Sequence, residues 1–380
     1  MSKDSISIGK HKGKLQVCEF YSGIGGYHLA LSKIPDLSFD VAAAFEISSN
    51  ANLLYRHNFP QTKVLETNLC GLTAKKLDTI MSCKVSSTSS QVDDSVISDS
   101  CDQERRTMFC MSPPCQPYSR QGSFKDNSDN RAESVQHLFS IFSDLTTKPD
   151  YFFLENVRGF ERSETRENII EFLKDHNYHM VEFLLNSNSL GIPNSRLRYY
   201  LLARKTPFPE LLQSSVFHSE IPGLEEIPEA PLICTFLEDD PQGYELSEKV
   251  LSRWGWVLDL VAPGDTRSCC FTKGYCNKAE GSGSVLQQNP SAPSNDNTDL
   301  GTERNDRSVS GCKLEGEEFL VHMKSLKLRY FTPREIARIH GIPEWFSIPA
   351  ELSTKQMYKL LGNGLNVTVV KLLIQHVLLK

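Results

Sequence analysis

The chain has 380 residues, of which 39% are hydrophobic and 23% are charged. This is enough to bury a large core, so fully disordered, collagen-like and mini-protein classes are excluded. Lys and Arg number 41 against 47 Asp and Glu, a net charge of −6, so any site for a polyanion must be local. There is no apolar run of about 18 residues and no secretory signal at the start. We expect a soluble cytoplasmic protein, with the nucleus as a second compartment.

The cysteine pattern gives no sign of a disulfide framework or a metal site. The chain holds 11 cysteines, including the adjacent pair Cys269 and Cys270, and contains no C-x-x-C pair. A reducing compartment therefore fits best, and we expect no metal.

Strand-like and helix-like segments alternate from the start of the chain. Residues 15–20 (LQVCEF) predict a buried strand that ends in the turn SGIGG, and residues 28–34 carry helical apolar spacing. We then expect strands at 40–45, 63–65, 107–111, 151–154, 180–185 and 198–203, and helices at 49–57, 134–145 and 165–177. This alternation predicts a parallel, doubly wound α/β domain of the Rossmann-like class.

Two segments lack this apolar pattern. Residues 82–104 contain eight serines in 23 residues, and residues 276–313 are rich in Gly, Ser, Asn, Asp and Pro. Both compositions predict disordered surface segments. Charge is also uneven: residues 211–250 hold nine acids and one lysine, whereas residues 321–380 hold nine Lys or Arg and three acids. A solvated face explains either run by itself, and the pair permits a basic groove.

The first chemical signal is a glycine turn followed by an acid. Tyr21-Ser-Gly-Ile-Gly-Gly26 lies between the first strand and the first helix, where glycines let a ligand approach the backbone. Glu46 follows at the end of the second strand, where a carboxylate can accept hydrogen bonds from ribose hydroxyls. Together they predict a cofactor that contains adenosine. A tight turn beside a surface acid is the alternative.

The second signal is a cysteine and a glutamate at the same edge of the predicted sheet. Cys115 lies in Ser112-Pro-Pro-Cys-Gln-Pro-Tyr118, just after one strand, and Glu155 ends another within YFFLENV. A thiolate and a carboxyl group that converge on one substrate suit methylation of cytosine at carbon 5. The thiolate attacks carbon 6, which makes carbon 5 nucleophilic, and Glu155 acts as an acid at ring nitrogen 3 if desolvation keeps it protonated.

The ordered motifs YSGIGG, SPPCQPYS, ENV, NSRLR and LLGNGLNV resemble the cytosine-5 methyltransferases that use S-adenosylmethionine. The resemblance implies that Cys115 is the nucleophile, that Glu155 contacts the base, and that Arg196 and Arg198 belong to the active site. Alternate spacing on a strand would place these arginines on one face. The family resemblance also implies which residues form the cofactor pocket. They are Tyr21, Ile24, Gly25, Gly26, Glu46, Ile47, Asn68, Leu69 and Ser112, with Asn363 and Gly364 closing the pocket.

Within the family, the chain looks most like the small branch that methylates the anticodon loop of transfer RNA for aspartate, at position thirty-eight. The tyrosine of YSGIGG, the form IPNSRLRYYLLAR, and Cys270-Phe271-Thr272 followed by KGY carry this likeness. We expect RNA contacts from Cys270, Phe271, Thr272 and Lys273, and from Arg120 and Arg158 beside the catalytic motifs.

The expected organisation has four parts. Residues 1–14 form a flexible tail, 15–206 the catalytic domain, 207–326 a small inserted target-recognition domain, and 327–380 return to complete the catalytic domain. The partner is transfer RNA, with weak DNA binding as a secondary expectation, and the protein is expected to be a monomer.

Two other functions remain open from the sequence. A DNA cytosine-5 methyltransferase would carry the same catalytic motifs, and a non-catalytic protein that binds RNA or the cofactor would share the fold. A nicotinamide oxidoreductase would explain the glycine turn but not SPPCQPYS or ENV.

Overall fold

The computed structural model describes residues 13–82, 106–114, 130–213, 217–289 and 316–380. The chain divides into two compact units. The first comprises Met1–Leu185, Arg198–Leu224 and Val370–Lys380, and the second comprises Asn186–Leu197 and Glu225–Val369. These contacts place residues 186–197 and 327–369 in the second unit and residues 207–224 in the first, and the four-part organisation expected from the sequence stays a prediction.

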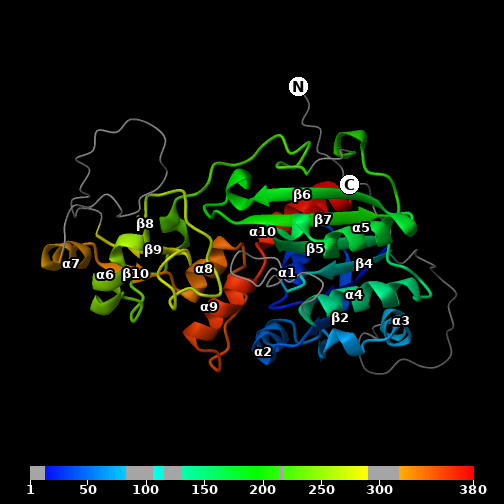
Figure 1. Cartoon of the computed structure of the whole chain (residues 1–380), viewed down its shortest axis with the longest axis horizontal. Helices are drawn as coiled ribbons and strands as arrows, with labels where there is room; N and C mark the ends of the chain where they lie inside the picture. The colour runs from blue at the N-terminus through cyan, green and yellow to red at the C-terminus, as the bar shows by residue number, and fades with distance from the viewer. Residues whose placement is uncertain (1–12, 83–105, 115–129, 214–216, 290–315) are drawn as a thin grey trace. The chain divides into compact units, whose positions relative to one another are not determined.

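The first unit contains a seven-stranded sheet in the order β3-β2-β1-β4-β5-β7-β6 (Figure 1). Its strands are β1 (Leu15–Phe20), β2 (Phe39–Glu46), β3 (Val64–Glu66), β4 (Arg106–Met111), β5 (Tyr151–Val157), β6 (His179–Asn186) and β7 (Leu197–Arg204). The first five strands run parallel, as predicted. All seven predicted strands are present, with ends shifted by at most a few residues.

The prediction of a parallel sheet is wrong for β7, which is antiparallel to β5. Figure 1 shows β6 and β7 as neighbouring arrows that point in opposite directions. The segment 187–196 that joins them holds only a short 3-10 turn, η4 (Ser187–Leu190). It is too short for the crossover helix that parallel neighbours need.

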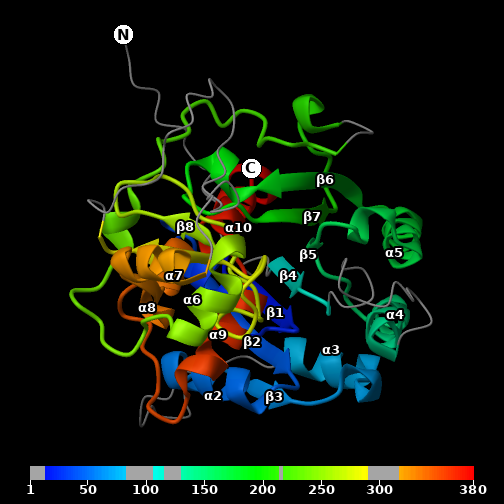
Figure 2. The same cartoon turned by 60° about the vertical axis from the view of Figure 1, so that its left-hand side comes forward.

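The helices of the first unit are α1 (Gly26–Ser32), α2 (Ser49–Asn58), α3 (Ala74–Ser82), α4 (Asn130–Ser143) and α5 (Glu164–Asp175). Short 3-10 turns are η1 (Leu69–Gly71), η3 (Phe160–Arg162) and η5 (Glu210–Leu212), and the chain ends in α10 (Val367–Leu373) and the π-helix η9 (Ile374–Leu378). Figure 2 shows α3, α4 and α5 along one side of the sheet.

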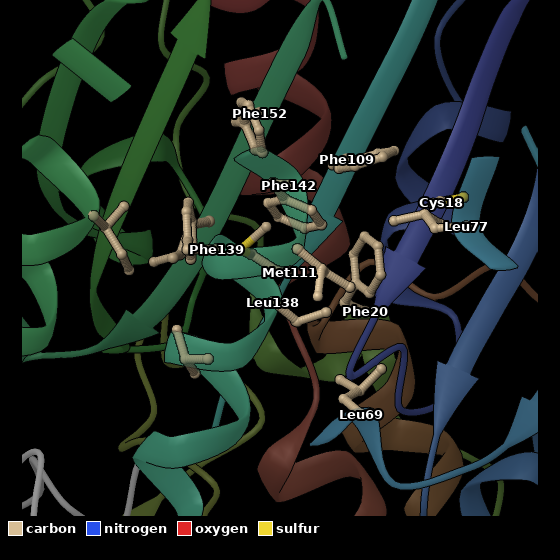
Figure 3. Close-up of a cluster of buried hydrophobic side chains, with 14 of the residues drawn as sticks. Cys18, Phe20, Leu69, Leu77, Phe109, Met111, Leu138, Phe139, Phe142 and Phe152 are labelled. Atoms are coloured by element: carbon tan, nitrogen blue, oxygen red, sulfur yellow. The ribbon is translucent and has the colours of Figure 1, made fainter. Parts of the chain in front are cut away.

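One sheet face and helices α3, α4 and α5 enclose a core rich in aromatic rings (Figure 3). Phe20 of β1 stacks on Phe45 of β2, with ring centroids 5.1 Å apart, and meets the Phe109 ring of β4 edge-on. Phe142 of α4 packs against Phe20 and Phe109. Since these positions alternate along the strands, every second residue of β1 and β4 is committed to this face.

The other face carries α1, α2 and a buried polar cluster. The Tyr55 hydroxyl of α2 donates to Glu19 Oε1 of β1 at 2.7 Å, and His28 Nδ1 of α1 lies 3.0 Å from the same hydroxyl. Burial raises the pKa of Glu19 to about 8 and lowers that of His28 to about 4. The cluster therefore ties β1, α1 and α2 together with groups that are uncharged at neutral pH.

The second unit has a three-stranded sheet in the order β10-β9-β8. Its elements are β8 (Asp259–Val261), β9 (Ser284–Gln287), β10 (Leu328–Tyr330), α6 (Glu248–Trp254), α7 (Gly316–Ser325), α8 (Pro333–Ile339) and α9 (Thr354–Asn363), with 3-10 turns η6 (Ile233–Phe236) and η7 (Gly255–Val257). Phe319 and Met323 of α7 pack with Leu251 of α6 and Leu328 of β10 to form its core. No helix within the described ranges is long and apolar enough to cross a membrane.

The predicted disorder of residues 276–313 is wrong for residues 276–289. Within this part, Ser284–Gln287 forms the central strand β9, which pairs with β8 and β10. The Tyr275 hydroxyl donates to the Ser284 carbonyl, and the Cys269 N–H donates to the Ser284 hydroxyl. Tertiary hydrogen bonds thus order a segment whose composition lacks apolar periodicity. Residues 290–313 lie outside the described residues, as does nearly all of 82–104.

The raised pKa of Glu19 makes a test of the buried cluster possible. Between the unfolded value of about 4.3 and the folded value of about 8, the folded state holds a proton that the unfolded state has lost. The free energy of unfolding therefore falls as pH rises through this window. Glu19→Gln cannot ionise, so its stability relative to the wild type should rise between about pH 5 and pH 8, by at most about 1.4 kcal/mol per pH unit.

Urea unfolding of both proteins at several pH values in this window measures the difference. Groups common to both proteins, such as His28, cancel in the comparison. A difference that stays constant with pH would contradict the assignment of a protonated Glu19.

Candidate functional site

A cavity of about 330 Å³ opens in the first unit, where β1, β2, β3 and β4 end. Five of the predicted cofactor residues line it: Tyr21, Glu46, Ile47, Asn68 and Leu69. The order of the strands explains the location. The chain runs from β1 to β2 and β3 on one side and then crosses from β3 to β4 on the other side of β1, which leaves a crevice at the carboxyl edge of the sheet. The volume lies within the range of small-molecule sites, roughly 300–1,000 Å³.

The glycine turn needs its glycines for backbone conformation and for close packing. Tyr21, Gly23 and Gly25 all have positive φ, at 54°, 53° and 87°. A Cβ on Gly25 would lie 3.0 Å from ring carbons of both Tyr55 and Phe59. The turn therefore presses against α2, and its backbone ends at the start of α1.

The Glu46 carboxylate is held by two backbone donors. Gly23 N–H donates to Oε2 at 3.0 Å, and Ser48 N–H donates to Oε1 at 2.8 Å. Each oxygen keeps a second lone pair, so both can still accept a hydrogen bond from a diol. The same carboxylate thus fixes the glycine turn, the start of α2 and a pair of acceptors in the cavity wall.

The cavity wall also offers apolar surface and a pair of hydroxyl groups. Ile47 lines the cavity although 67% of its surface is exposed, which suits contact with a flat heterocycle. The Tyr21 hydroxyl lies 2.7 Å from the Ser134 hydroxyl of α4. This contact joins the glycine turn to a helix more than a hundred residues away in the sequence.

Sequence reasoning missed six of the residues that line the cavity: Phe45, Thr67, Cys70, Pro114, Glu133 and Ser134. The first four are direct neighbours of predicted positions, so extending each motif by one or two residues would have found them. Glu133 and Ser134 carry no local signal, because only the packing of α4 brings them to the cavity.

Four further predicted cofactor residues lie close to these elements but do not line the cavity. Gly25 and Gly26 form the cap and first residue of α1, and Ile24 is buried beside them. The Ser112 hydroxyl, after β4, donates to the Tyr27 hydroxyl at 3.3 Å. Contacts of these residues with a cofactor stay predictions.

An ion pair between Glu155 and Arg198 lies at the same edge of the sheet. Arg198 Nε is 3.3 Å from Glu155 Oε1, and both side chains are largely buried. Arg198 is the second residue of the antiparallel strand β7 and lies opposite Val157, so its guanidinium reaches along the face that carries Glu155.

The predicted nucleophile Cys115 and the predicted RNA contact Arg120 lie outside the described residues. The residues just before Cys115 are described. Ser112 N–H donates to the Phe20 carbonyl at 3.3 Å, and Asn156 Nδ2 of the ENV motif donates to the Pro113 carbonyl at 3.4 Å. The start of the SPPCQPYS motif and the ENV motif therefore meet where β1, β4 and β5 end.

Arg196 does not share a strand face with Arg198, because β7 begins only at Leu197. Arg196 is buried in the second unit, and its guanidinium donates to the Phe271, Gly362 and Gly364 carbonyls and lies 3.4 Å from the Cys270 sulfur. The motifs NSRLR, CFT and LLGNG are thus joined by one side chain.

The predicted RNA contacts differ in exposure. Phe271 is only 1% exposed and packs edge-on against Tyr275 and Phe331, so it belongs to the core of the second unit rather than to its surface. Cys270 and Thr272 are half-buried. Lys273 and, in the first unit, Arg158 are exposed.

Asn363 and Gly364 end α9 in the second unit, where Asn363 is exposed. Gly362 of the same helix end lies so close to Thr272 that a Cβ would be 2.2 Å from the Thr272 carbonyl carbon. The proposed contribution of Asn363 and Gly364 to the cofactor pocket stays a prediction.

Comparison with known proteins identifies the family. The family model described as C-5 cytosine-specific DNA methylase matches residues 15–378. The chain belongs to this family.

Similar proteins are named as methyltransferases of either transfer RNA or DNA. The tRNA (cytosine(38)-C(5))-methyltransferase of Bos taurus is 35% identical, covering 95% of this chain and 98% of the relative. The DNA (cytosine-5)-methyltransferase of Dictyostelium discoideum is 30% identical, and the match covers 95% of this chain and 94% of the relative. The solved structure of a Spodoptera frugiperda DNMT2 mutant is 34% identical, covers 94% and 98% of the two chains, and has a TM-score of 0.75.

C-5 cytosine methylases use S-adenosylmethionine, and the residues of the cavity fit that cofactor. Glu46 offers acceptors for the ribose hydroxyls, and Ile47 and Leu69 offer apolar surface for the adenine. The resemblance stated from the sequence is confirmed, and so is the predicted cofactor.

We predict that Glu46→Ala weakens binding of S-adenosylmethionine by roughly 10- to 100-fold, because charged hydrogen bonds to the ribose and the support of the glycine turn are both lost. Titration calorimetry with the full chain measures the dissociation constant. Glu66→Ala is the matched control, since Glu66 ends the neighbouring strand β3, is exposed and does not line the cavity. Equal affinity in the Glu46 variant and the wild type would exclude the ribose role.

Proposed function

We propose that the protein transfers a methyl group from S-adenosylmethionine to carbon 5 of a cytosine in the anticodon loop of transfer RNA, at position thirty-eight of the transfer RNA for aspartate. The observation that carries this is the 35% identity, over nearly the full length of both chains, to a relative named for that reaction. The family membership supports the chemistry, and so does the Glu155–Arg198 pair, which lies at the same edge of the sheet as the cavity.

The reaction needs a nucleophile because carbon 5 of cytosine does not accept a methyl group unaided. The Cys115 thiolate adds to carbon 6 and makes carbon 5 an enamine carbon. Bound S-adenosylmethionine supplies the methyl group to carbon 5. Loss of the carbon 5 proton and departure of the thiolate from carbon 6 then restore the aromatic ring and the free cysteine.

Glu155 and Arg198 bind and polarise the base in this proposal. A carboxyl group at ring nitrogen 3 draws electron density from carbon 6, which eases attack by the thiolate. Arg198, 3.3 Å from Glu155, orients the carboxyl group and adds a donor for the exocyclic oxygen of the base. Burial of the pair strengthens both effects.

An anticodon loop suits this site on energetic grounds. Its bases are unstacked or nearly so, whereas a base in a duplex costs a few kcal/mol to flip out. Recognition of the loop then depends mainly on phosphate contacts.

A basic surface of the second unit can supply such contacts. Lys355 and Lys359 are exposed on one face of α9, since they are one helical turn apart. Lys273 is exposed on the segment that packs against Gly362 at the end of the same helix. Within the described part of the chain, none of these three lysines is paired with an acid. We define Lys273, Lys355 and Lys359 as the lysine surface.

The central test offers labelled S-adenosylmethionine with unmodified transfer RNA for aspartate and with duplex DNA at equal concentration. We expect label on the RNA, and none with Cys115→Ala. Cys234→Ala is the matched control, because Cys234 is an exposed cysteine of the second unit. Normal turnover by the Cys115 variant would overturn the covalent mechanism, and label on DNA alone would overturn the substrate.

Loss of the lysine surface should weaken RNA binding in a salt-dependent way. For Lys355→Ala with Lys359→Ala we expect the KM for transfer RNA to rise roughly tenfold and the slope of log K against log salt to fall by about two. Lys148→Ala with Lys174→Ala is the control, since these lysines precede β5 and β6 at the opposite edge of the sheet. An unchanged salt slope would remove the lysine surface from the RNA site.

A DNA cytosine-5 methyltransferase is the second candidate function. The description of the family and the name of the Dictyostelium discoideum relative favour it. The side-by-side substrate assay separates it from the first. Action as a monomer in the cytoplasm stays a prediction.

A further inference from the structure

A buried tyrosine joins the helix of the cofactor turn to the strand that leads to the catalytic cysteine. Tyr27 is the second residue of α1 and is 1% exposed. Its hydroxyl donates to the Met111 carbonyl at 2.9 Å and accepts from the Ser112 hydroxyl at 3.3 Å. Met111 ends β4, and Cys115 follows four residues later in the sequence.

Met111 pairs with Phe20 of β1 and Leu154 of β5 in the sheet. Besides this pairing, α1, β1 and β5 each contact the residues that lead to Cys115, and the Tyr27 contact is the shortest of these three. Ser112 N–H reaches the Phe20 carbonyl of β1 at 3.3 Å, and Asn156 of β5 reaches the Pro113 carbonyl at 3.4 Å. Both distances lie beyond the usual 2.9–3.0 Å of N–H···O bonds. The sheet fixes Met111, and the Tyr27 hydroxyl adds the shortest contact at the point where the chain leaves the sheet at Ser112.

The ring of Tyr27 is held independently of its hydroxyl. It packs edge-on against Phe153 of β5, with centroids 5.3 Å apart. Burial raises the pKa of Tyr27 well above its ordinary value, so the hydroxyl remains a donor over the working range of pH. Removal of the hydroxyl alone therefore changes the link to β4 and little else.

We propose that the Tyr27 hydroxyl is a positioning group for the segment Met111–Pro114, and that it couples the geometry of the cofactor turn to that of the chain entering the catalytic motif. Its effect on rate rests on the proposed function, because the reacting thiol belongs to Cys115. A displacement of about 1 Å at a reacting group can cost up to about 100-fold in rate.

The test compares Tyr27→Phe with Tyr178→Phe in the full chain. Tyr178 is also buried, and its hydroxyl donates to the Pro149 carbonyl, which precedes β5 at the opposite edge of the sheet. For Tyr27→Phe we expect kcat about tenfold lower, with the KM for S-adenosylmethionine within about twofold of the wild type. The control should keep the kcat of the wild type.

Amide hydrogen exchange gives a readout that does not depend on activity. Because Ser112 N–H donates to the Phe20 carbonyl, its exchange should be about tenfold faster in Tyr27→Phe and unchanged in Tyr178→Phe. If the wild type fails to methylate transfer RNA, the proposed function fails, while exchange at Ser112 still tests the positioning role.

Two results would overturn the inference. One is a folded Tyr27→Phe protein with unchanged kcat and unchanged exchange at Ser112. The other is a rise in the KM for S-adenosylmethionine at constant kcat, which would restrict Tyr27 to the cofactor turn. If Tyr27→Phe does not fold, Ser112→Ala removes one of the two hydrogen bonds, and an unchanged kcat and exchange there would likewise overturn the proposal.

Discussion

The candidate site depends on the pairing of β1 with β2 on one side and with β4 on the other. Phe20, the last residue of β1, is level with Phe45 of β2 and with Met111 of β4. This register brings the glycine turn, Glu46 and the residues before Cys115 to one edge of the sheet. The stacked and edge-on rings of Phe20, Phe45 and Phe109 stabilise it, because a slip by one residue would turn these rings away from the core.

Polar side chains at this edge of the sheet are held by hydrogen bonds and an ion pair that also place them for the proposed reaction. Glu46 accepts two backbone N–H groups, and Glu155 meets a guanidinium. Tyr27 uses its hydroxyl to join α1 to the end of β4. Such contacts offset the cost of burial and hold acceptors and donors in place before any ligand binds.

In the second unit, a single arginine connects motifs that are far apart in the sequence. Arg196 reaches the CFT segment and the end of α9, so NSRLR, CFT and LLGNG form one structural unit. The family resemblance implied an active-site role for Arg196, which stays a prediction. The expectation that Arg196 and Arg198 share a strand face is wrong, because β7 starts one residue after Arg196. Phe271 shows the same limit, since a short motif does not reveal whether its aromatic residue is exposed.

The sequence by itself determined the fold class, the first five parallel strands, the family and the cofactor, and it named five residues that line one cavity. These features depend on local sequence patterns: short apolar runs that indicate buried strands, a glycine turn, and acidic residues at the ends of strands. Only the tertiary structure decided three features. These are the antiparallel direction of β7, the formation of strand β9 in a segment predicted to be disordered, and the presence of Glu133 and Ser134 at the cavity. Each of these results from hydrogen bonds or packing between segments distant in the chain, for which no local pattern carries a signal.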